Sequence, residues 1–157
     1  MQPKSQNQKP VFVSQTPFVN GTADTLAVFC SDGRFVQQTA DYLRSLGISL
    51  VDWEVWPGGG HLIFGPENLK EACKVLSAFL KDHHGIKNII LIAHLADCGW
   101  FKHTHAEIGQ AEERDSAQVD CLKELRQAWQ TAFPDVRLAI LIARPNSENL
   151  VEFLAIE

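Results

Sequence analysis

Apolar runs and amphipathic stretches alternate along most of the chain. Five segments have the short apolar runs or the alternating pattern typical of β-strands, namely residues 25–30, 49–56, 87–93, 136–143 and 150–156. Three segments carry apolar side chains at helical spacing, namely 34–46, 67–84 and 115–133. Gly47 and Gly85 are predicted to end the first two helices. The alternation predicts an α/β fold with a mainly parallel sheet and helices on both faces.

The pattern also suggests how the strands are arranged. A doubly wound sheet of order 2-1-3-4 is expected, with 150–156 as an antiparallel strand at an edge. The segment 49–56 alternates, with Val51, Trp53 and Val55 on one face and a wetter face opposite, which favours an edge position. We expect a tail and lead-in over 1–24, its first ten residues loose, and one α/β domain over 25–157.

Composition narrows the class of protein. The chain has 157 residues, 45% hydrophobic and 21% charged, which are globular values that argue against a disordered, collagen-like or disulfide-scaffold protein. Its 14 basic and 19 acidic side chains give a net charge of −5, which disfavours nucleic acid as a partner. The polar start, Met1–Pro10, has no signal-peptide core, and no apolar run reaches the roughly 20 residues of a membrane helix. We therefore expect a cytoplasmic protein whose cysteines are thiols or metal ligands.

Two predicted strands end in unusual polar clusters. Cys30-Ser31-Asp32-Gly33-Arg34 follows the first strand, and the third leads into His94 and then Asp97-Cys98-Gly99. If these strands are neighbours, two thiols and an imidazole converge at one edge of the sheet. Zinc favours such a set, and three protein ligands leave a fourth position open, as in catalytic sites.

Asp32 and Arg34 are placed to assist such a metal. An arginine fork can hold a carboxylate through two charge-assisted hydrogen bonds. A carboxylate held in this way stays ionised and can accept a proton from a metal-bound water. The combination indicates a site that adds hydroxide to a small electrophile, although a plain surface ion pair is the alternative.

These motifs resemble the β-class carbonic anhydrases. CSDGR at 30–34 fits that family's Cys-x-Asp-x-Arg, and His94 followed by Asp-Cys-Gly after a hydrophobic strand is similar to its second motif. The likeness extends over 25–157, including the glycine-rich turn at 57–60. It implies a zinc-dependent lyase that interconverts CO₂ and bicarbonate through zinc-bound hydroxide. It further implies Cys30, His94 and Cys98 as zinc ligands and Asp32 with Arg34 as the catalytic dyad.

The resemblance carries two further expectations. It implies a homodimer, or a higher homo-oligomer, with active sites near the subunit interface. It also implies that Asp32 can swing onto zinc as a fourth ligand and close the site.

One feature departs from the family pattern. The second motif is normally His-x-x-Cys, whereas three residues separate His94 from Cys98 here. The extra residue can bulge out, or it can displace the imidazole and leave another histidine to serve as ligand. The candidate substitutes are His61, His103 and His105.

Other interpretations remain open at this stage. A related hydrolase could act on carbonyl sulfide or carbon disulfide, or the chain could be a non-catalytic zinc-binding or interaction domain whose insertion has spoiled the site. In that last case, deleting Leu95 or Ala96 should raise CO₂ hydration. Cys73 and Cys121 lie on apolar helical faces and are predicted to be core residues. The turn at 57–60 is predicted to let backbones approach closely rather than to hold a phosphate.

Overall fold

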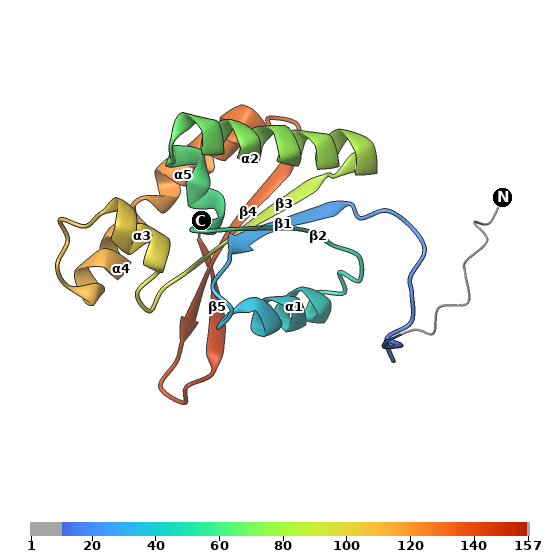
Figure 1. The fold of residues 1–157 in the computed structure, drawn as a ribbon, viewed down its shortest axis with the longest axis horizontal. Helices are drawn as coiled ribbons and strands as arrows, with labels where there is room; N and C mark the ends of the chain where they lie inside the picture. The colour runs from blue at the N-terminus through green and yellow to red at the C-terminus, as the bar shows by residue number, and fades with distance from the viewer. Residues whose placement is uncertain (1–10, 157) are drawn as a thin grey trace.

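A five-stranded sheet forms the centre of the molecule (Figure 1). The computed structural model describes residues 11–156, so the expected loose tail lies outside the described residues. The strands are β1 Thr25–Cys30, β2 Asp52–Trp56, β3 Asn88–His94, β4 Arg137–Pro145 and β5 Val151–Ile156. Their order is β2-β1-β3-β4-β5; the first four are parallel, and β5 is antiparallel to β4. The predicted order and the antiparallel edge strand are confirmed.

Helices cover both faces of this sheet. The longer helices α2, Glu67–Leu80, and α5, Leu122–Ala132, lie over one face, and α1, Val36–Ser45, lies over the other (Figure 1). The remaining helical elements are the 3₁₀ turn η1, Gly59–Phe64, the π-helical turn η2, Lys81–Gly85, and the helices α3, Gly99–Thr104, and α4, Ala111–Asp120. None of the helices in the described part of the chain is long and apolar enough to span a membrane.

Residues on the central strands alternate between two apolar clusters. Leu26, Val28 and Leu91 face the cluster that contains Trp129 of α5. Their neighbours along the strands face the second cluster, on the α1 side. Because both sides are covered, β1 and β3 are buried along almost their whole length, which explains their continuous apolar sequences.

The edge position predicted for β2 is confirmed, but the predicted wetter face is wrong. Trp53 and Val55 are 43% and 46% exposed, whereas Glu54 is only 5% exposed. Glu54 lies towards α2, where its Oε2 accepts hydrogen bonds from Trp56 Nε1 at 3.1 Å and Ser77 Oγ at 2.9 Å. These donors compensate for part of the cost of burying a carboxyl group.

The predicted ends of the first two helices are confirmed, but part of the predicted apolar face of α2 is exposed. Gly47 and Gly85 have φ of 78° and 76° and end their helical segments as predicted. Leu76 and Phe79, which belong to the apolar stripe of the predicted helix over 67–84, are exposed. Cys73 lies inward as predicted, and Ser77 lies inward although it is polar.

The predicted helix over 115–133 is two helices. α4 begins at Ala111, and the break falls at Cys121, whose ψ of −12° departs from the usual helical value near −42°. The helix α3 lies outside the three segments in which the sequence pattern predicted helices.

Candidate metal centre

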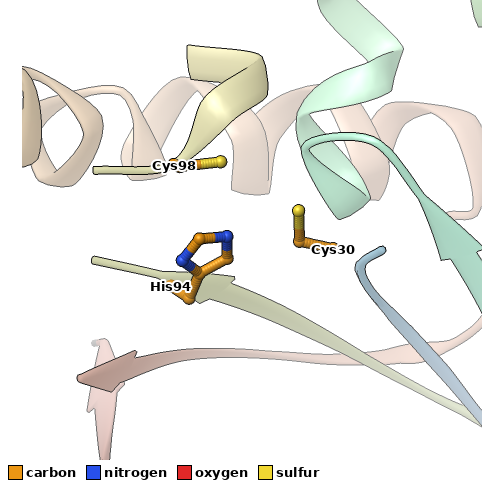
Figure 2. Close-up of side chains that lie close together, drawn as sticks. All are labelled: Cys30, His94 and Cys98. Carbon is orange, nitrogen blue, oxygen red and sulfur yellow. The ribbon is translucent and has the colours of Figure 1, made fainter. Parts of the chain in front are cut away.

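Cys30, His94 and Cys98 meet at one edge of the sheet. Cys30 ends β1, His94 ends the neighbouring parallel strand β3, and Cys98 directly precedes α3. All three are buried, and their candidate ligand atoms lie within 4.8 Å of one another. Figure 2 shows the two thiols and the imidazole directed towards a common space. The expected convergence is therefore present, and this cluster does not include the candidate substitutes His61, His103 and His105.

The imidazole of His94 is held in one orientation. Its Nδ1 lies 2.9 Å from the carbonyl oxygen of Leu95, which can only accept a hydrogen bond. The proton of the neutral ring therefore lies on Nδ1, and Nε2 carries a lone pair. Nε2 is buried without a hydrogen-bond partner, and the ring stacks on Phe35 at a centroid distance of 4.6 Å. A buried, unpartnered nitrogen directed at two sulfurs fits a metal ligand.

Cys30 lies where a thiolate is favoured. The backbone N–H of Gly58 donates to its Sγ at 3.3 Å. A hydrogen bond from Cys98, together with the nearby His94, lowers the pKa of Cys30 well below its usual range despite partial burial. The thiolate is the form that binds metals, so these contacts prepare Cys30 for that role.

The glycine-rich turn packs directly against the end of β1. A Cβ on Gly59 would lie 2.8 Å from the carbonyl carbon of Phe29 and 2.9 Å from the nitrogen of Cys30. A Cβ on Gly58 would lie 2.1 Å from the indole of Trp100. The prediction of a close backbone approach is confirmed, and this approach is what brings the Gly58 N–H to the Cys30 sulfur.

Asp32 and Arg34 form the expected two-pronged ion pair. Arg34 Nε donates to Asp32 Oδ1 at 3.0 Å, and Nη2 donates to Oδ2 at 2.6 Å. The Arg34 hydrogen bond lowers the pKa of Asp32 to about 2. The side chain of Asp32 is 19% exposed, and its Oδ2 lies 3.8 Å from His94 Nε2. An ionised carboxylate therefore adjoins the cluster of candidate ligands.

The extra residue between His94 and Cys98 is accommodated as a local bulge. Ala96 and Asp97 have φ of 68° and 60°, a left-handed conformation that non-glycine residues seldom adopt. Asp115 of α4 accepts hydrogen bonds from both backbone N–H groups. Sequence reasoning missed Asp115 and its neighbour Arg114, because nothing in a helical stretch marks two side chains that contact a distant loop.

His61 lies in the wall of a separate cavity. The cavity has a volume of about 320 Å³ and is also lined by Phe101 and His105. Burial lowers the pKa of His61 to about 4, which keeps the ring neutral at neutral pH.

The other two cysteines lie outside the metal cluster. Cys73 is fully buried in the core on the α2 side, and burial raises its pKa to about 12, as expected of a core residue. Cys121 is partly buried and packs beside Cys30 and Cys98.

Comparison with known proteins places the fold. No family model matches the sequence. An uncharacterized protein of Rickettsia bellii is 27% identical over 121 residues, which is 74% of this chain and 73% of that protein.

Solved structures of low sequence identity share the architecture. The β-carbonic anhydrase isoform I of Trichomonas vaginalis is similar with a TM-score of 0.58 at 15% identity, covering 90% of this chain and 88% of that one. The β-carbonic anhydrase CafA of Aspergillus fumigatus is similar with a TM-score of 0.52 at 17% identity, and the match covers 85% of this chain and 76% of that one. One of two tetrameric β-carbonic anhydrases of Sordaria macrospora is similar with a TM-score of 0.51 at 15% identity, and the match covers 88% of this chain and 84% of that one. This chain therefore has a β-carbonic anhydrase-like fold.

Proposed function

We propose that this protein is a zinc-dependent carbonic anhydrase-like lyase that catalyses the reversible hydration of CO₂ to bicarbonate and a proton. The observation that carries the proposal is the meeting of two cysteine sulfurs with the unpartnered Nε2 of His94, beside an ionised Asp32. The β-carbonic anhydrase-like fold and the CSDGR motif at 30–34 support it.

Cys30, His94 and Cys98 would hold the zinc. Two sulfurs and one imidazole are the soft donor set that zinc accepts, and three protein ligands suit a catalytic site. Bound zinc lowers the pKa of a coordinated water to about 7 and so supplies a nucleophile at neutral pH. The Gly58 N–H stabilises the Cys30 thiolate, and the Leu95 carbonyl fixes the tautomer of His94.

Asp32 is the proposed proton acceptor and Arg34 its positioning partner. With a pKa of about 2, the Asp32 carboxylate is ionised throughout the neutral range and can accept a hydrogen bond or a proton at Oδ2. Arg34 donates to both carboxylate oxygens of Asp32, which restricts the direction in which Oδ2 points. Asp32 could also serve as a fourth zinc ligand, which would close the site.

The same proposal includes a homo-oligomer, at least a dimer. Apolar side chains are exposed on edge strand β2, at Trp53 and Val55, and on the segment before β1, at Phe12 and Phe18. A second copy could cover such surfaces. We place the protein in the cytoplasm, where its free thiols would stay reduced. Light scattering on purified protein should give a mass of at least twice 17.5 kDa.

The test combines zinc content with catalysis. Freshly purified protein should contain about one zinc per chain and accelerate CO₂ hydration in a stopped-flow indicator assay. Cys30→Ser should lose both properties, while Cys121→Ser, which changes a partly buried thiol outside the metal cluster, should retain them. A zinc content near zero after zinc is added back would overturn the proposal.

Two other results would indicate a different function. Stoichiometric zinc without CO₂ hydration would indicate a zinc-binding domain. Stoichiometric zinc with hydrolysis of carbonyl sulfide or carbon disulfide in place of CO₂ hydration would indicate a related hydrolase.

A further inference from the structure

The backbone between His94 and Cys98 adopts a conformation that it would not adopt unaided. Ala96 and Asp97 are consecutive and both left-handed, with φ of 68° and 60°. In this region the Cβ of an L-residue crowds its own backbone, so such residues persist only where their surroundings hold them. The loop that carries the extra residue therefore needs contacts from elsewhere in the fold.

Two adjacent residues of α4 supply contacts on one side of this loop. The carboxylate of Asp115 accepts hydrogen bonds from the backbone N–H of Ala96 at 3.1 Å and of Asp97 at 3.4 Å. Arg114 donates from Nε and Nη2 to Asp97 Oδ1 at 2.9 and 2.6 Å. Asp115 thus holds the backbone of the loop, and Arg114 holds the side chain of Asp97.

Arg114 is itself fixed. Its side chain is 8% exposed, and Nη1 donates to the carbonyl oxygens of Ile108 and Gly109 at 2.7 and 2.9 Å. The guanidinium therefore joins the segment before α4 to the loop before α3. Such a buried, fully engaged arginine is a rigid support.

The loop also contacts the candidate catalytic groups. Arg34 Nη2 donates to the carbonyl oxygen of Ala96 at 3.2 Å, while the same nitrogen donates to Asp32. The Leu95 carbonyl fixes the ring of His94. A shift of this short loop would move Cys98, release His94 and loosen Arg34 together.

We propose that Arg114 and Asp115 are positioning residues of the metal site. They hold residues 95–97 in the left-handed bulge that keeps His94 and Cys98 directed at one centre despite the extra residue. The inference rests on the proposed function, because it takes this centre to bind zinc. Outer partners of metal ligands commonly change metal affinity about 10–100-fold when they are removed.

The experiment measures zinc affinity in purified variants by competition with a chromogenic chelator. Asp115→Ala should weaken zinc binding about 10–100-fold, and Asp115→Asn, which keeps one acceptor oxygen, should weaken it less. Glu113→Ala is the matched control, because it removes an exposed acidic side chain from the same helix. It should leave the affinity unchanged.

A rescue variant separates positioning from general damage to the fold. Ala96→Gly removes the Cβ that disfavours the left-handed backbone, so Asp115→Ala with Ala96→Gly should recover part of the lost affinity. A purely structural effect of Asp115 on α4 would not be relieved by a glycine in another loop. The d–d spectrum of cobalt-substituted protein should change in Asp115→Ala and return towards wild type in the double variant.

A metal-independent measurement makes the two proposals distinguishable. In zinc-free protein, the backbone amide of Ala96 should exchange with solvent faster in Asp115→Ala than in wild type, because its acceptor is gone. Wild type that binds no zinc overturns the proposed function and, with it, the positioning role. Wild type that binds zinc, with unchanged affinity and unchanged amide exchange in a folded Asp115→Ala, overturns this inference alone.

Discussion

His94 Nε2 lies 3.8 Å from Asp32 Oδ2, so the carboxylate that is hydrogen-bonded to Arg34 lies beside the candidate zinc ligands. Asp32 follows β1 and His94 ends β3, and the two meet because β1 and β3 are parallel neighbours that end at the same edge of the sheet. A carboxylate beside the candidate metal centre is the arrangement that the proposed hydration of CO₂ needs.

Replacing that carboxylate should abolish most of the catalysis without removing the metal. Asp32→Asn should lower the kcat for CO₂ hydration by about 10²–10⁴-fold, the usual contribution of a positioned acid–base group. Zinc content should stay near one per chain. Asp41→Asn is the control, because Asp41 forms an exposed ion pair with Arg44 at 2.8 Å and lies outside the metal cluster. Equal kcat in the two variants would exclude Asp32 from catalysis.

Stability should depend on pH through Glu54. Burial raises the pKa of this carboxyl group above 4.5, despite hydrogen bonds from Trp56 and Ser77. The folded state therefore binds the proton more tightly than the unfolded state, and the stabilisation is complete below about pH 4.5. It is lost as the pH rises from the unfolded pKa through the folded pKa, by about 1.4 kcal/mol for each pH unit that separates the two values.

Glu54→Gln should remove this dependence. Urea titrations should show that the unfolding free energy of the variant rises relative to that of wild type between pH 4 and pH 8. Glu67→Gln, which changes an exposed glutamate in the first turn of α2, should leave the pH profile as it is. Parallel profiles for Glu54→Gln and wild type would show that burial does not raise the pKa of this carboxyl group.

A side chain at Gly59 should disrupt the end of β1. Its φ is +57°, and a Cβ would lie under 3 Å from backbone atoms of Phe29 and Cys30, which are fixed by the sheet. Gly59→Ala should therefore lower the unfolding free energy by about 1–3 kcal/mol or more and weaken zinc binding. Gly109→Ala, where a Cβ meets nothing within 4 Å, is the control. Comparable melting temperatures for the two variants would contradict the close approach.

Zinc should protect the Cys30 thiol from alkylation. After removal of zinc by a chelator, iodoacetamide should alkylate Cys30, whose thiolate is favoured, and zinc should block that reaction. Cys73 should stay unmodified in both states, because burial raises its pKa to about 12. Peptide mass spectrometry gives the extent of reaction at each site. Equal alkylation of Cys30 with and without zinc would argue against its role as a ligand.

Shortening the bulge should harm the site. Deleting Ala96 restores the His-x-x-Cys spacing, but it removes the N–H bonded to Asp115 and the carbonyl bonded to Arg34. We expect weaker zinc binding and slower CO₂ hydration. Faster hydration than wild type, in the same stopped-flow assay, would mean that the extra residue spoils the site.

The sequence predicted the sheet well because its central strands are buried on both faces. β1 and β3 need apolar side chains at almost every position, so their bounds stand out from polar surroundings. The face of β2 was predicted wrongly, because a lone glutamate among tryptophans and valines gives no sign that Trp56 and Ser77 will offset the cost of its burial. The same limit applies to α2, where the polar Ser77 lies inward and donates a hydrogen bond to Glu54.

Residue chemistry alone was enough to single out Cys30, Asp32, Arg34, His94 and Cys98, because polar groups at the ends of buried parallel strands must share one edge of the sheet. Only the tertiary structure decided whether the extra residue would displace His94. That outcome depends on Asp115 and Arg114, whose hydrogen bonds to Ala96 and Asp97 hold a backbone conformation that the loop's own residues disfavour. Local preference is encoded in neighbouring residues, whereas the contacts that override it come from side chains that only the folded chain brings near.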